Sequence, residues 1–392
     1  MRSEFLVFGA PKLGEAEIDE VVATLRSGWL GTGPKVARFE ERFAEYLGLD
    51  REQAVAVNSC TAALHLSLLS ADVAGGEVIT TPMTFCATVN AIIHAGGTPV
   101  LVDIDPATLN IDAAALASAV GPNTRAIVPV HFAGYPCDMT AIEAIARRHG
   151  LAVIEDCAHA IESRIDGGAC GTFGDFGCFS FYVTKNVVCG EGGMVVAANP
   201  EHAGRLRRMA LHGLSVDASK RFGPSGYKHY EVSECGFKYN MMDIQAALGL
   251  HQLARVEANL SRRESIWRAY DSALADTPVL RPPVPSPASA LRHARHLYTI
   301  RVSESGEPAL RDSFIDELRS RMIGVGVHYV SLPEHPYYRE RFGWHPDAWP
   351  VARDVGRSTL SLPLSPSLSD ADVRDVVEAV RATAAELLGT AA

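Results

Sequence analysis

The sequence lacks paired cysteines, a long apolar run and an excess of basic residues. Its 8 cysteines stand singly with no CxxC or zinc-ligand spacing, so we expect reduced thiols and no metal site. No apolar run approaches the ~20 residues that a membrane-spanning helix needs, and the N-terminal segment has no signal-peptide core. We therefore expect a cytoplasmic protein that does not associate with membranes. The formal net charge of -10 argues against nucleic acid as a partner.

Two signatures of nucleotide binding are also missing. The sequence contains no GxxxxGK[ST] loop, and the glycines of GTFGDFG (171–177) have the wrong spacing for a dinucleotide fingerprint. A nicotinamide-dependent dehydrogenase is therefore disfavoured. What is present is 392 residues with 47% hydrophobic and 21% charged side chains, which is typical of a globular protein with two or three domains.

From residue 54 the sequence alternates short β-rich runs with helical patterns. This alternation predicts βαβ units, and hence an α/β fold with a mostly parallel central sheet. In such sheets ligands bind beyond the carboxyl ends of the strands, so residues just after each run are candidate site residues. The predicted strands cover residues 54–57, 77–81, 98–104, 125–132, 151–156, 177–182 and 192–198.

The second half of the chain has a different pattern. The polar segment 213–243 has few periodic apolar positions and is predicted to be a mobile loop or an interface arm. A long helical pattern at 243–274 follows, and the Pro-rich run 278–289 marks a boundary. A smaller α+β unit is predicted beyond it, from the runs 296–302 and VGVHYV (325–330) and from helices around 311–323 and 370–388.

Asp156 lies at the carboxyl end of the predicted strand LAVIED, and His159 follows three residues later. The aspartate could be an ordinary helix N-cap. A buried carboxylate can instead hold a heterocyclic nitrogen protonated through a charge-assisted hydrogen bond. Earlier in the chain, the stretch VNSCTAALHL places Ser59 between a strand and a helix, where free N–H groups bind an anion or hydroxyls cap the helix.

Lys185 stands in the break between the strand-like runs FSFY and GGMVV. A lysine desolvated at a sheet edge becomes a usable nucleophile and base, although a lysine in a loop is usually solvated. Ser180 precedes it, and the run CGEGG (189–193) lets the backbone approach another group closely. An imine-forming lysine, a strand-end aspartate and an anion-binding helix start are together the parts of a pyridoxal phosphate site.

Several motifs carry a family resemblance. NSCTAALHLSL, TTPMTFCATVNAI, VIEDCAHA, FSFYVTKNVVCGEGGMV and GFKYNMMDIQAALG occur in this order, preceded by GWLGTGPKVARFEERFAEYLG and followed by VHYVSLPEHPYY. They resemble the DegT/DnrJ/EryC1/StrS family of sugar aminotransferases from about residue 8 to 385. The resemblance implies the type I, aspartate-aminotransferase-like fold. We expect a large cofactor-binding domain at 1–255, whose arm 1–20 packs on a small C-terminal domain at 256–392.

The resemblance also implies roles for individual residues. Lys185 would be the Schiff-base lysine, Asp156 would pair with the pyridine nitrogen of pyridoxal phosphate, and His159 would lie near its phenolic oxygen. These three residues are the catalytic candidates. Pyridoxamine phosphate would be the intermediate form of the cofactor.

The remaining cofactor contacts implied by the resemblance come from other strand ends. Phe85 would stack on the pyridine face, and the phosphate would bind Ser180 and the backbone of Thr61 and Ala62. A polar residue of the motif GFKYNM would reach the phosphate site of a partner subunit. We expect Asn240 rather than Lys238 in that role, and hence a homodimer with shared active sites.

Substrate contacts are expected from three places: the GWLGTG loop with Trp29 and Gly31, the arm with Lys238, and the pair His328–Tyr329. Turn glycines and a packed strand pair would explain the same residues. The resemblance implies L-glutamate as donor and a nucleotide-linked keto-sugar as acceptor. The closest motif similarity is to members that aminate C4 of a 4-keto-6-deoxyhexose or 4-keto-pentose on dTDP or UDP.

Three alternatives remain open from the sequence. The chain could aminate C3 of a keto-sugar or an inosose, or it could make an aminated aromatic acid as another branch of the family does. A dehydratase of the same family would carry histidine in place of Lys185, so this function is disfavoured. A non-catalytic sensor that only binds the cofactor is the alternative from another class.

Overall fold

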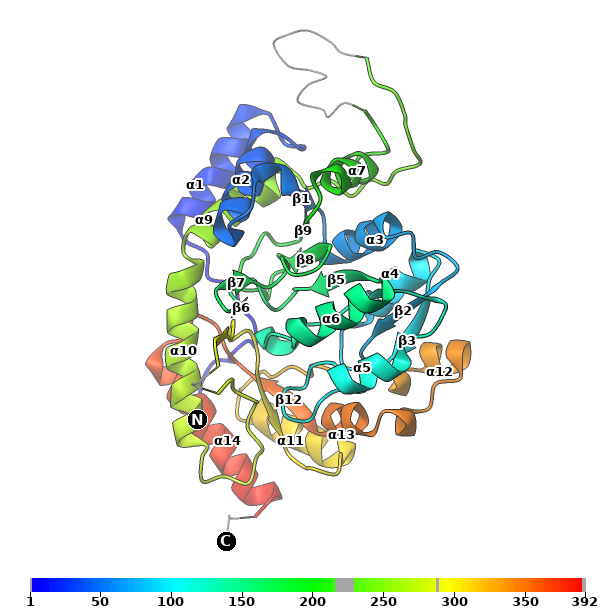
Figure 1. Cartoon of the computed structure of the whole chain (residues 1–392). Coiled ribbons are helices and arrows are strands. Elements are labelled where there is room, and N and C mark those ends of the chain that lie inside the picture. The colour runs from blue at the N-terminus through cyan, green and yellow to red at the C-terminus, as the bar shows by residue number, and fades with distance from the viewer. Residues whose placement is uncertain (1, 216–228, 287–288, 390–392) are drawn as a thin grey trace.

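The structure, a computed structural model, describes residues 2–215, 229–286 and 289–389. Figure 1 shows a central sheet between layers of helices, with the C-terminal part of the chain packed below it. The helices are α1 (Glu15–Ser27), α2 (Pro34–Leu47), α3 (Cys60–Ser70), α4 (Cys86–His94), α5 (Ala113–Ala119), α6 (Met139–His149), α7 (Pro200–Ala210), α9 (Asp243–Ala254), α10 (Val256–Ala273), α11 (Pro308–Ser320), α12 (Pro336–Phe342), α13 (Pro350–Ser358) and α14 (Asp370–Leu387).

The large sheet has the strand order β1-β9-β8-β5-β4-β2-β3 within the described residues. Its strands β2, β3, β4, β5 and β8 pair in parallel, as expected from the alternating pattern, whereas β9 runs antiparallel to both β1 and β8. The sequence pattern did not predict this reversal. The connection from β8 to β9 contains no crossover helix, and neighbouring strands joined in that way must be antiparallel. The strands are β1 (Ala54–Val57), β2 (Glu77–Thr80), β3 (Thr98–Leu101), β4 (Thr124–Ile127), β5 (Ala152–Asp156), β6 (Arg164–Ile165), β7 (Gly168–Ala169), β8 (Phe176–Ser180), β9 (Gly193–Ala197), β10 (Leu291–Arg292), β11 (Tyr298–Arg301) and β12 (Thr359–Leu362).

Both faces of this sheet are buried. Successive strand residues alternate between two apolar clusters, for example Val153 and Ile154 of β5. One face packs against α2, α5, α6 and α9, and the other packs against α3, α4 and α7. Burial on both sides explains why the strands appear in the sequence as continuous apolar runs.

A separate apolar cluster forms the core of the C-terminal part. Strands β11 and β12 pair antiparallel, and α10, α11 and α14 pack on them around Trp267 and Phe314. The N-terminal segment also lies here, because Leu6 pairs with Ile323 and packs against this cluster. The division of the chain at residue 255 stays a prediction.

Several contacts between the two parts lie at the carboxyl end of β3. The Asp103 carboxylate accepts hydrogen bonds from the backbone N–H groups of Val351 and Ala352 at 3.0 and 2.9 Å, so it caps the start of α13. The indole N–H of Trp349 donates to the Leu101 carbonyl at 2.9 Å. These contacts hold the C-terminal part over the edge of the sheet where ligands bind in α/β proteins.

Three expectations were wrong in detail. The helical pattern 243–274 forms two helices, which meet at Arg255. The predicted strand 125–132 is shorter than expected, since β4 covers Thr124–Ile127 and Val130 beyond it makes an isolated bridge to Asp156. The run 325–330 is not a strand, since β11 pairs with β12 and only Gly326 of the run makes a bridge, to Ser361.

The predicted arm lies partly outside the described residues. Residues 216–228 of the arm are the ones outside the described ranges. The described ends of the segment are pinned by the bridges Leu214–Val232 and Leu211–Lys238. No helix in 2–215, 229–286 or 289–389 is long and apolar enough to cross a bilayer.

Candidate active site

Asp156 lies at the carboxyl end of β5 and is buried. One carboxylate oxygen accepts a hydrogen bond from the Thr88 hydroxyl at 2.8 Å, and the other accepts the backbone N–H of Ala158 at 3.1 Å. Burial raises the pKa of the Asp156 carboxyl, while these two hydrogen bonds and the charge of Lys185 oppose that rise. A cationic partner would therefore stabilise the ionised form of this carboxylate.

Lys185 follows β8 and is partly buried. Burial lowers the pKa of its amine from 10.5 to about 8, with Cys60 and Asp156 acting in the opposite direction. The free amine is the nucleophilic form, so burial raises the fraction of Lys185 that is reactive near neutral pH. The structure thus brings the predicted lysine and aspartate to one place.

His159 lies three residues beyond Asp156 and is also buried. Its Nδ1 accepts the backbone N–H of Ala133 at 3.2 Å, and its Nε2 lies 3.0 Å from the Tyr329 hydroxyl. Burial lowers the pKa of His159 well below its usual value, and the charge of Lys185 lowers it further. His159 is consequently neutral, and because Nδ1 is an acceptor, Nε2 donates its hydrogen to Tyr329.

The N-terminus of α3 lies beside the end of β8. Ser59 caps the helix by accepting the Ala62 N–H at 3.1 Å, which leaves the N–H groups of Cys60 and Thr61 without intrahelical acceptors. Gly193 is paired with Ser180, and a Cβ on Gly193 would lie 2.5 Å from the Ser59 carbonyl carbon. Because Gly193 has no side chain, β9 and its partner residue Ser180 can lie against the start of α3. Such a helix start binds anions.

Phe85 presents an exposed aromatic ring, with 57% of its surface accessible. Its ring centroid lies 5.9 Å from that of Tyr329, and both side chains line a cavity of about 640 Å³. The other lining residues include aromatic, histidine and amide side chains from α4, the 327–335 segment and α12. An exposed ring at a strand end is a stacking platform for a flat ligand.

The GWLGTG loop and the end of the arm form one unit. Asn240 Nδ2 donates to the Thr32 hydroxyl at 2.6 Å, and the Trp29 indole donates to the Thr32 carbonyl at 3.1 Å. Gly31 is exposed, and its carbonyl accepts the Asp243 N–H at 3.0 Å. Lys238 is exposed, whereas Asn240 is partly buried. Within one chain, Asn240 therefore contacts its own loop, and its contact with a partner subunit stays a prediction.

His328 lies near Lys185 on the other side of the site. Its Nδ1 lies 2.9 Å from the hydroxyl of the buried Ser361. Burial lowers the pKa of His328 to about 4, and the charge of Lys185 acts in the same direction. His328 thus lies within the electrostatic reach of Lys185, and Tyr329 contacts His159. Their role as substrate contacts stays a prediction.

Five polar residues at this site were missed in the sequence. They contact the predicted residues, or the neighbours of those residues, through hydrogen bonds or ring contacts. Asn186, which directly follows Lys185, offered one recoverable signal, because a polar residue after a buried lysine needs a partner. The others had no local signal, since their partners are far away in the chain. The missed residues are Thr88, Glu162, Asn186, Arg263 and His296.

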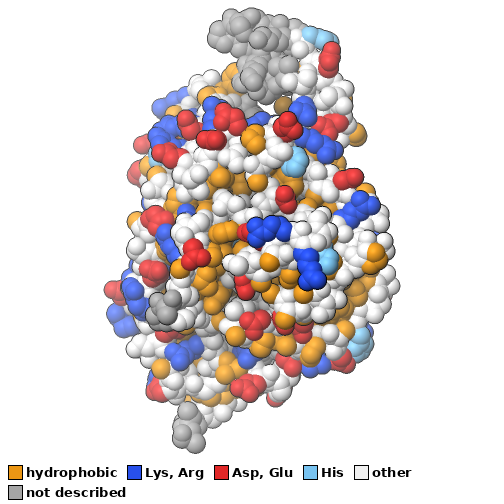
Figure 2. Space-filling view, viewed as in Figure 1, with side chains coloured by type: hydrophobic (Ala, Val, Ile, Leu, Met, Phe, Trp, Pro, Cys, Tyr) orange, Lys and Arg blue, Asp and Glu red, His pale blue; other side chains and the backbone are white. Residues whose placement is uncertain are grey.

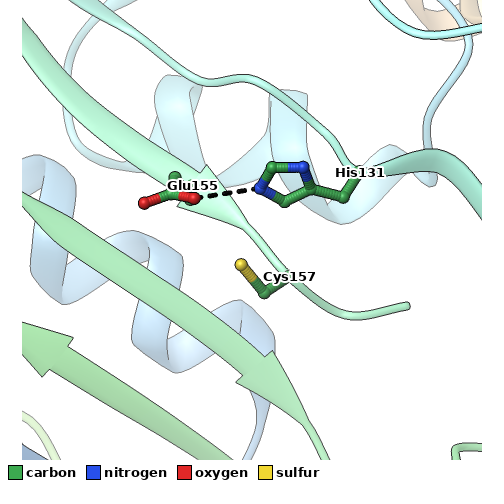
Figure 3. Close-up of side chains that lie close together, drawn as sticks. All are labelled: His131, Glu155 and Cys157. Atoms are coloured by element: carbon green, nitrogen blue, oxygen red, sulfur yellow. Dashed lines mark hydrogen bonds and ion pairs between the residues drawn. The ribbon is translucent and has the colours of Figure 1, made fainter. Parts of the chain in front are cut away.

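A buried cluster below the site could be mistaken for a metal centre. Glu155 on β5 and His131 face each other, with Cys157 close by (Figure 3). His131 Nε2 lies 3.0 Å from Glu155, and His131 Nδ1 accepts the Cys137 N–H. Glu155 also accepts backbone N–H groups of residues 171, 173 and 174 at 2.7–2.8 Å. Because the ligand atoms of the carboxylate and imidazole are occupied by hydrogen bonds, the cluster is a structural support for the 171–174 loop.

The residues at the strand ends fit pyridoxal phosphate. An amine with a lowered pKa suits the aldehyde, and a buried carboxylate suits a protonated ring nitrogen. The free N–H groups of Cys60 and Thr61 at the start of α3, together with Ser180, suit a phosphate, and the exposed Phe85 suits a planar ring. The residues therefore match the aldehyde, the ring nitrogen, the phosphate and the ring face of pyridoxal phosphate.

Comparison with known proteins points the same way. The model of the DegT/DnrJ/EryC1/StrS aminotransferase family matches residues 11–381. The chain is 48% identical over 382 residues to the spore coat polysaccharide biosynthesis protein SpsC of Bacillus subtilis, covering 97% of each chain. It is 37% identical to the aminotransferase TlmJ of Streptoalloteichus hindustanus, with a TM-score of 0.88 and coverage of 98% and 100%.

A further solved structure was determined with a cofactor. The putative sugar aminotransferase Spr1654 of Streptococcus pneumoniae, in its pyridoxal phosphate form, is 33% identical with a TM-score of 0.90 and coverage of 98% and 99%. It is also known in a pyridoxamine phosphate form. These similarities confirm the predicted type I fold.

Proposed function

The chain belongs to the DegT/DnrJ/EryC1/StrS aminotransferase family, and from this premise we propose that it aminates C4 of a nucleotide-linked 4-keto-sugar with L-glutamate as donor. Membership confirms the predicted enzyme class, a pyridoxal phosphate-dependent aminotransferase. The observation that carries the proposal is the meeting of Lys185, whose amine has a pKa of about 8, with the buried Asp156.

Pyridoxal phosphate, when bound, supplies the electron sink that stabilises a carbanion next to the transferred nitrogen. Lys185 is proposed to move the proton from the α-carbon of the donor to the cofactor carbon that carries the transferred nitrogen. In the second half-reaction it would move a proton in the opposite direction, onto the sugar carbon that receives the amine. Its free-amine form accepts the α-carbon proton, and burial makes this form accessible at neutral pH. In the same scheme, Asp156 holds the ring nitrogen protonated.

The remaining residues bind and orient. Ser180 and the N–H groups at the start of α3 would hold the phosphate, and Phe85 would lie on one face of the ring. His159 would lie near the phenolic oxygen, and its neutral form can donate a hydrogen bond from Nε2. These roles are supported by the free N–H groups at the start of α3, the exposed ring of Phe85 and the hydrogen bond from Ala133 to His159 Nδ1.

The acceptor is proposed from relatives and from motifs. SpsC is named a polysaccharide biosynthesis protein, and Spr1654 a putative sugar aminotransferase. The acidic composition and the interspersed charges on the face seen in Figure 2 give no support to a nucleic-acid partner. Trp29, Gly31, Lys238, His328 and Tyr329 are proposed as the substrate-binding residues. The proposed assembly is a homodimer in which Asn240 reaches the partner's phosphate site.

A substrate panel tests the proposal. Purified enzyme is incubated with L-glutamate and with 4-keto and 3-keto sugars on dTDP or UDP, and NMR of the product locates the new amine. Amination at C4 supports the proposal. Amination at C3, or turnover of an inosose or a cyclic keto acid instead, would favour the corresponding alternative.

A half-reaction separates an enzyme from a sensor. Glutamate alone should convert the bound cofactor to its amine form in one turnover, with a stoichiometric yield of 2-oxoglutarate. A protein that only senses the cofactor would bind it and show no conversion.

A further inference from the structure

A chain of hydrogen bonds links α10 to the residue after Lys185. Arg263 forms an ion pair with Glu162, and the two side chains are 1% and 0% exposed. Asn186 Nδ2 donates to Glu162 at 2.7 Å, and Asn186 Oδ1 lies 2.9 Å from His296 Nδ1. A buried contact therefore runs from the C-terminal part of the chain to a histidine near the lysine.

Chemistry fixes the direction of every hydrogen bond along this chain. Arginine only donates and a carboxylate only accepts, so Asn186 must turn its NH₂ group to Glu162 and its carbonyl oxygen to His296. A second contact of Asn186 Nδ2, at 3.3 Å from the Ala294 carbonyl, selects the same orientation. Because a carbonyl oxygen accepts, His296 Nδ1 carries the hydrogen and Nε2 keeps a lone pair.

His296 is buried against the catalytic candidates. Its ring centroid lies 4.4 Å from that of His159. Burial lowers the pKa of His296 well below its usual value, and among the neighbouring charges that of Lys185 has the largest effect. The ring is therefore neutral at pH 7. The titratable and charged groups that face it are Lys185, His159, His293, Arg263 and His328.

We propose that Asn186 is a positioning residue for the proposed base Lys185, acting through His296. Held by Glu162 and Arg263, Asn186 fixes His296 as the Nδ1–H tautomer, so that Nε2 keeps its lone pair. Among the charged neighbours of the ring, Lys185 acts most strongly on it, and a ring without an Nε2–H favours the protonated amine. The opposite tautomer would present an N–H donor to an ammonium group and oppose it. This inference rests on the proposed role of Lys185 in the reaction.

The tautomer can be measured directly. NMR of the holoenzyme with ¹⁵N-labelled histidine distinguishes Nδ1–H, Nε2–H and imidazolium forms, and His296→Gln assigns the signal among the 14 histidines. We expect His296 to be the neutral Nδ1–H form at pH 7. An Nε2–H or imidazolium signal for this residue would overturn the proposal.

Glu162→Gln provides a sharper test because it keeps the shape of the side chain. Arg263 would then bind the carbonyl oxygen of the new glutamine, whose NH₂ group would face the Asn186 oxygen. Asn186 would turn its NH₂ group to His296, and the tautomer should shift toward Nε2–H. An unchanged Nδ1–H signal in a folded variant would show that the chain does not set the tautomer.

The kinetic consequence needs a matched control. Asn186→Ala should lower kcat by about 10- to 100-fold with little change in KM, since it misplaces the proton-transfer group and removes no substrate contact. Asn199→Ala removes an asparagine whose side chain accepts the Glu201 N–H at 2.9 Å at the start of α7, and it should leave kcat unchanged. Equal losses in both variants would contradict a positioning role. The NMR readout requires no sugar substrate, so failure of this inference is distinguishable from failure of the proposed function.

Discussion

His159 Nε2 lies 3.0 Å from the Tyr329 hydroxyl, although the two residues are 170 positions apart in the chain. His159 belongs to the loop after β5, and Tyr329 comes from the segment between α11 and α12. The hydrogen bond therefore closes the site between the large sheet and the C-terminal part. It also ties the cofactor candidates to the 640 Å³ cavity beside Phe85.

The reactivity of Lys185 should follow its lowered pKa. The folded chain releases this proton near pH 8, whereas an unfolded chain holds it to about pH 10.5. Attachment of pyridoxal phosphate to the apoenzyme should accelerate as pH rises to about 8 and then level off. Stopped-flow absorbance across pH 6–10 measures the rate of this attachment. Borohydride reduction followed by peptide mapping should locate the label on Lys185. A plateau first reached near pH 10 would contradict the environment described here.

Asp156→Asn should separate activity from stability. The change keeps the size of the side chain but removes the charge opposite the ring nitrogen, so kcat should fall by at least about 100-fold. Burial raises the pKa of this carboxyl in the folded chain, so its ionisation above about pH 4 opposes folding. The apoenzyme variant should thus unfold at an equal or higher denaturant concentration at pH 7. A large loss of stability would assign a structural role to Asp156.

Gly193→Ala should weaken cofactor binding. Its Cβ would lie within 2.5–2.7 Å of the Ser59 and Cys60 backbone, and relief of this clash separates β9 from the start of α3. Overpacking costs about 1–3 kcal/mol of folding stability. Because the displaced backbone belongs to the proposed phosphate site, we expect weaker binding of pyridoxal phosphate as well. Gly204→Ala in α7 is the control, since its Cβ would meet only Arg208 Nη1 at 3.8 Å. Absorbance titration of the apoenzymes gives both affinities.

Chelators should have no effect. The acceptor atoms of His131 and Glu155 are occupied by hydrogen bonds, so the buried cluster offers a metal ion little without breaking them. Incubation with EDTA should leave the melting temperature and the half-reaction rate unchanged. A drop of several degrees that zinc restores would identify a metal site.

Subunit mixing should reveal whether Asn240 acts across an interface. Lys185→Ala and Asn240→Ala homodimers should each have low activity. Mixed dimers contain one site with both native residues only if Asn240 serves the partner's site, so co-expression should then recover activity. No recovery would show that Asn240 acts within its own chain, through the contact with Thr32.

The sequence predicted the parts of this molecule that depend on local pattern. Runs buried on both faces of the sheet are continuous in the sequence, so β1 and β5 were located with little error. Asp156 ends one such run and Lys185 lies in the loop after another, and they meet because strand ends meet at one edge.

Other features depend on distant partners. The contacts of His296 and Arg263 with Asn186 and Glu162 require the C-terminal part to fold back over the sheet. The segment 325–330 has the apolar pattern of a strand, but the β11–β12 pairing leaves it outside the ladder. Neither outcome is encoded in the spacing of nearby residues.

The reversal of β9 has a consequence for the order of assembly. Because β8 and β9 are adjacent along the chain and pair antiparallel, the loop that carries Lys185 is closed by a hairpin of short sequence separation. Contacts of that kind form at low entropic cost, before long-range pairings. We expect a nascent chain to shape the lysine loop early, and to acquire Tyr329 and the rest of the cavity only when synthesis is nearly complete.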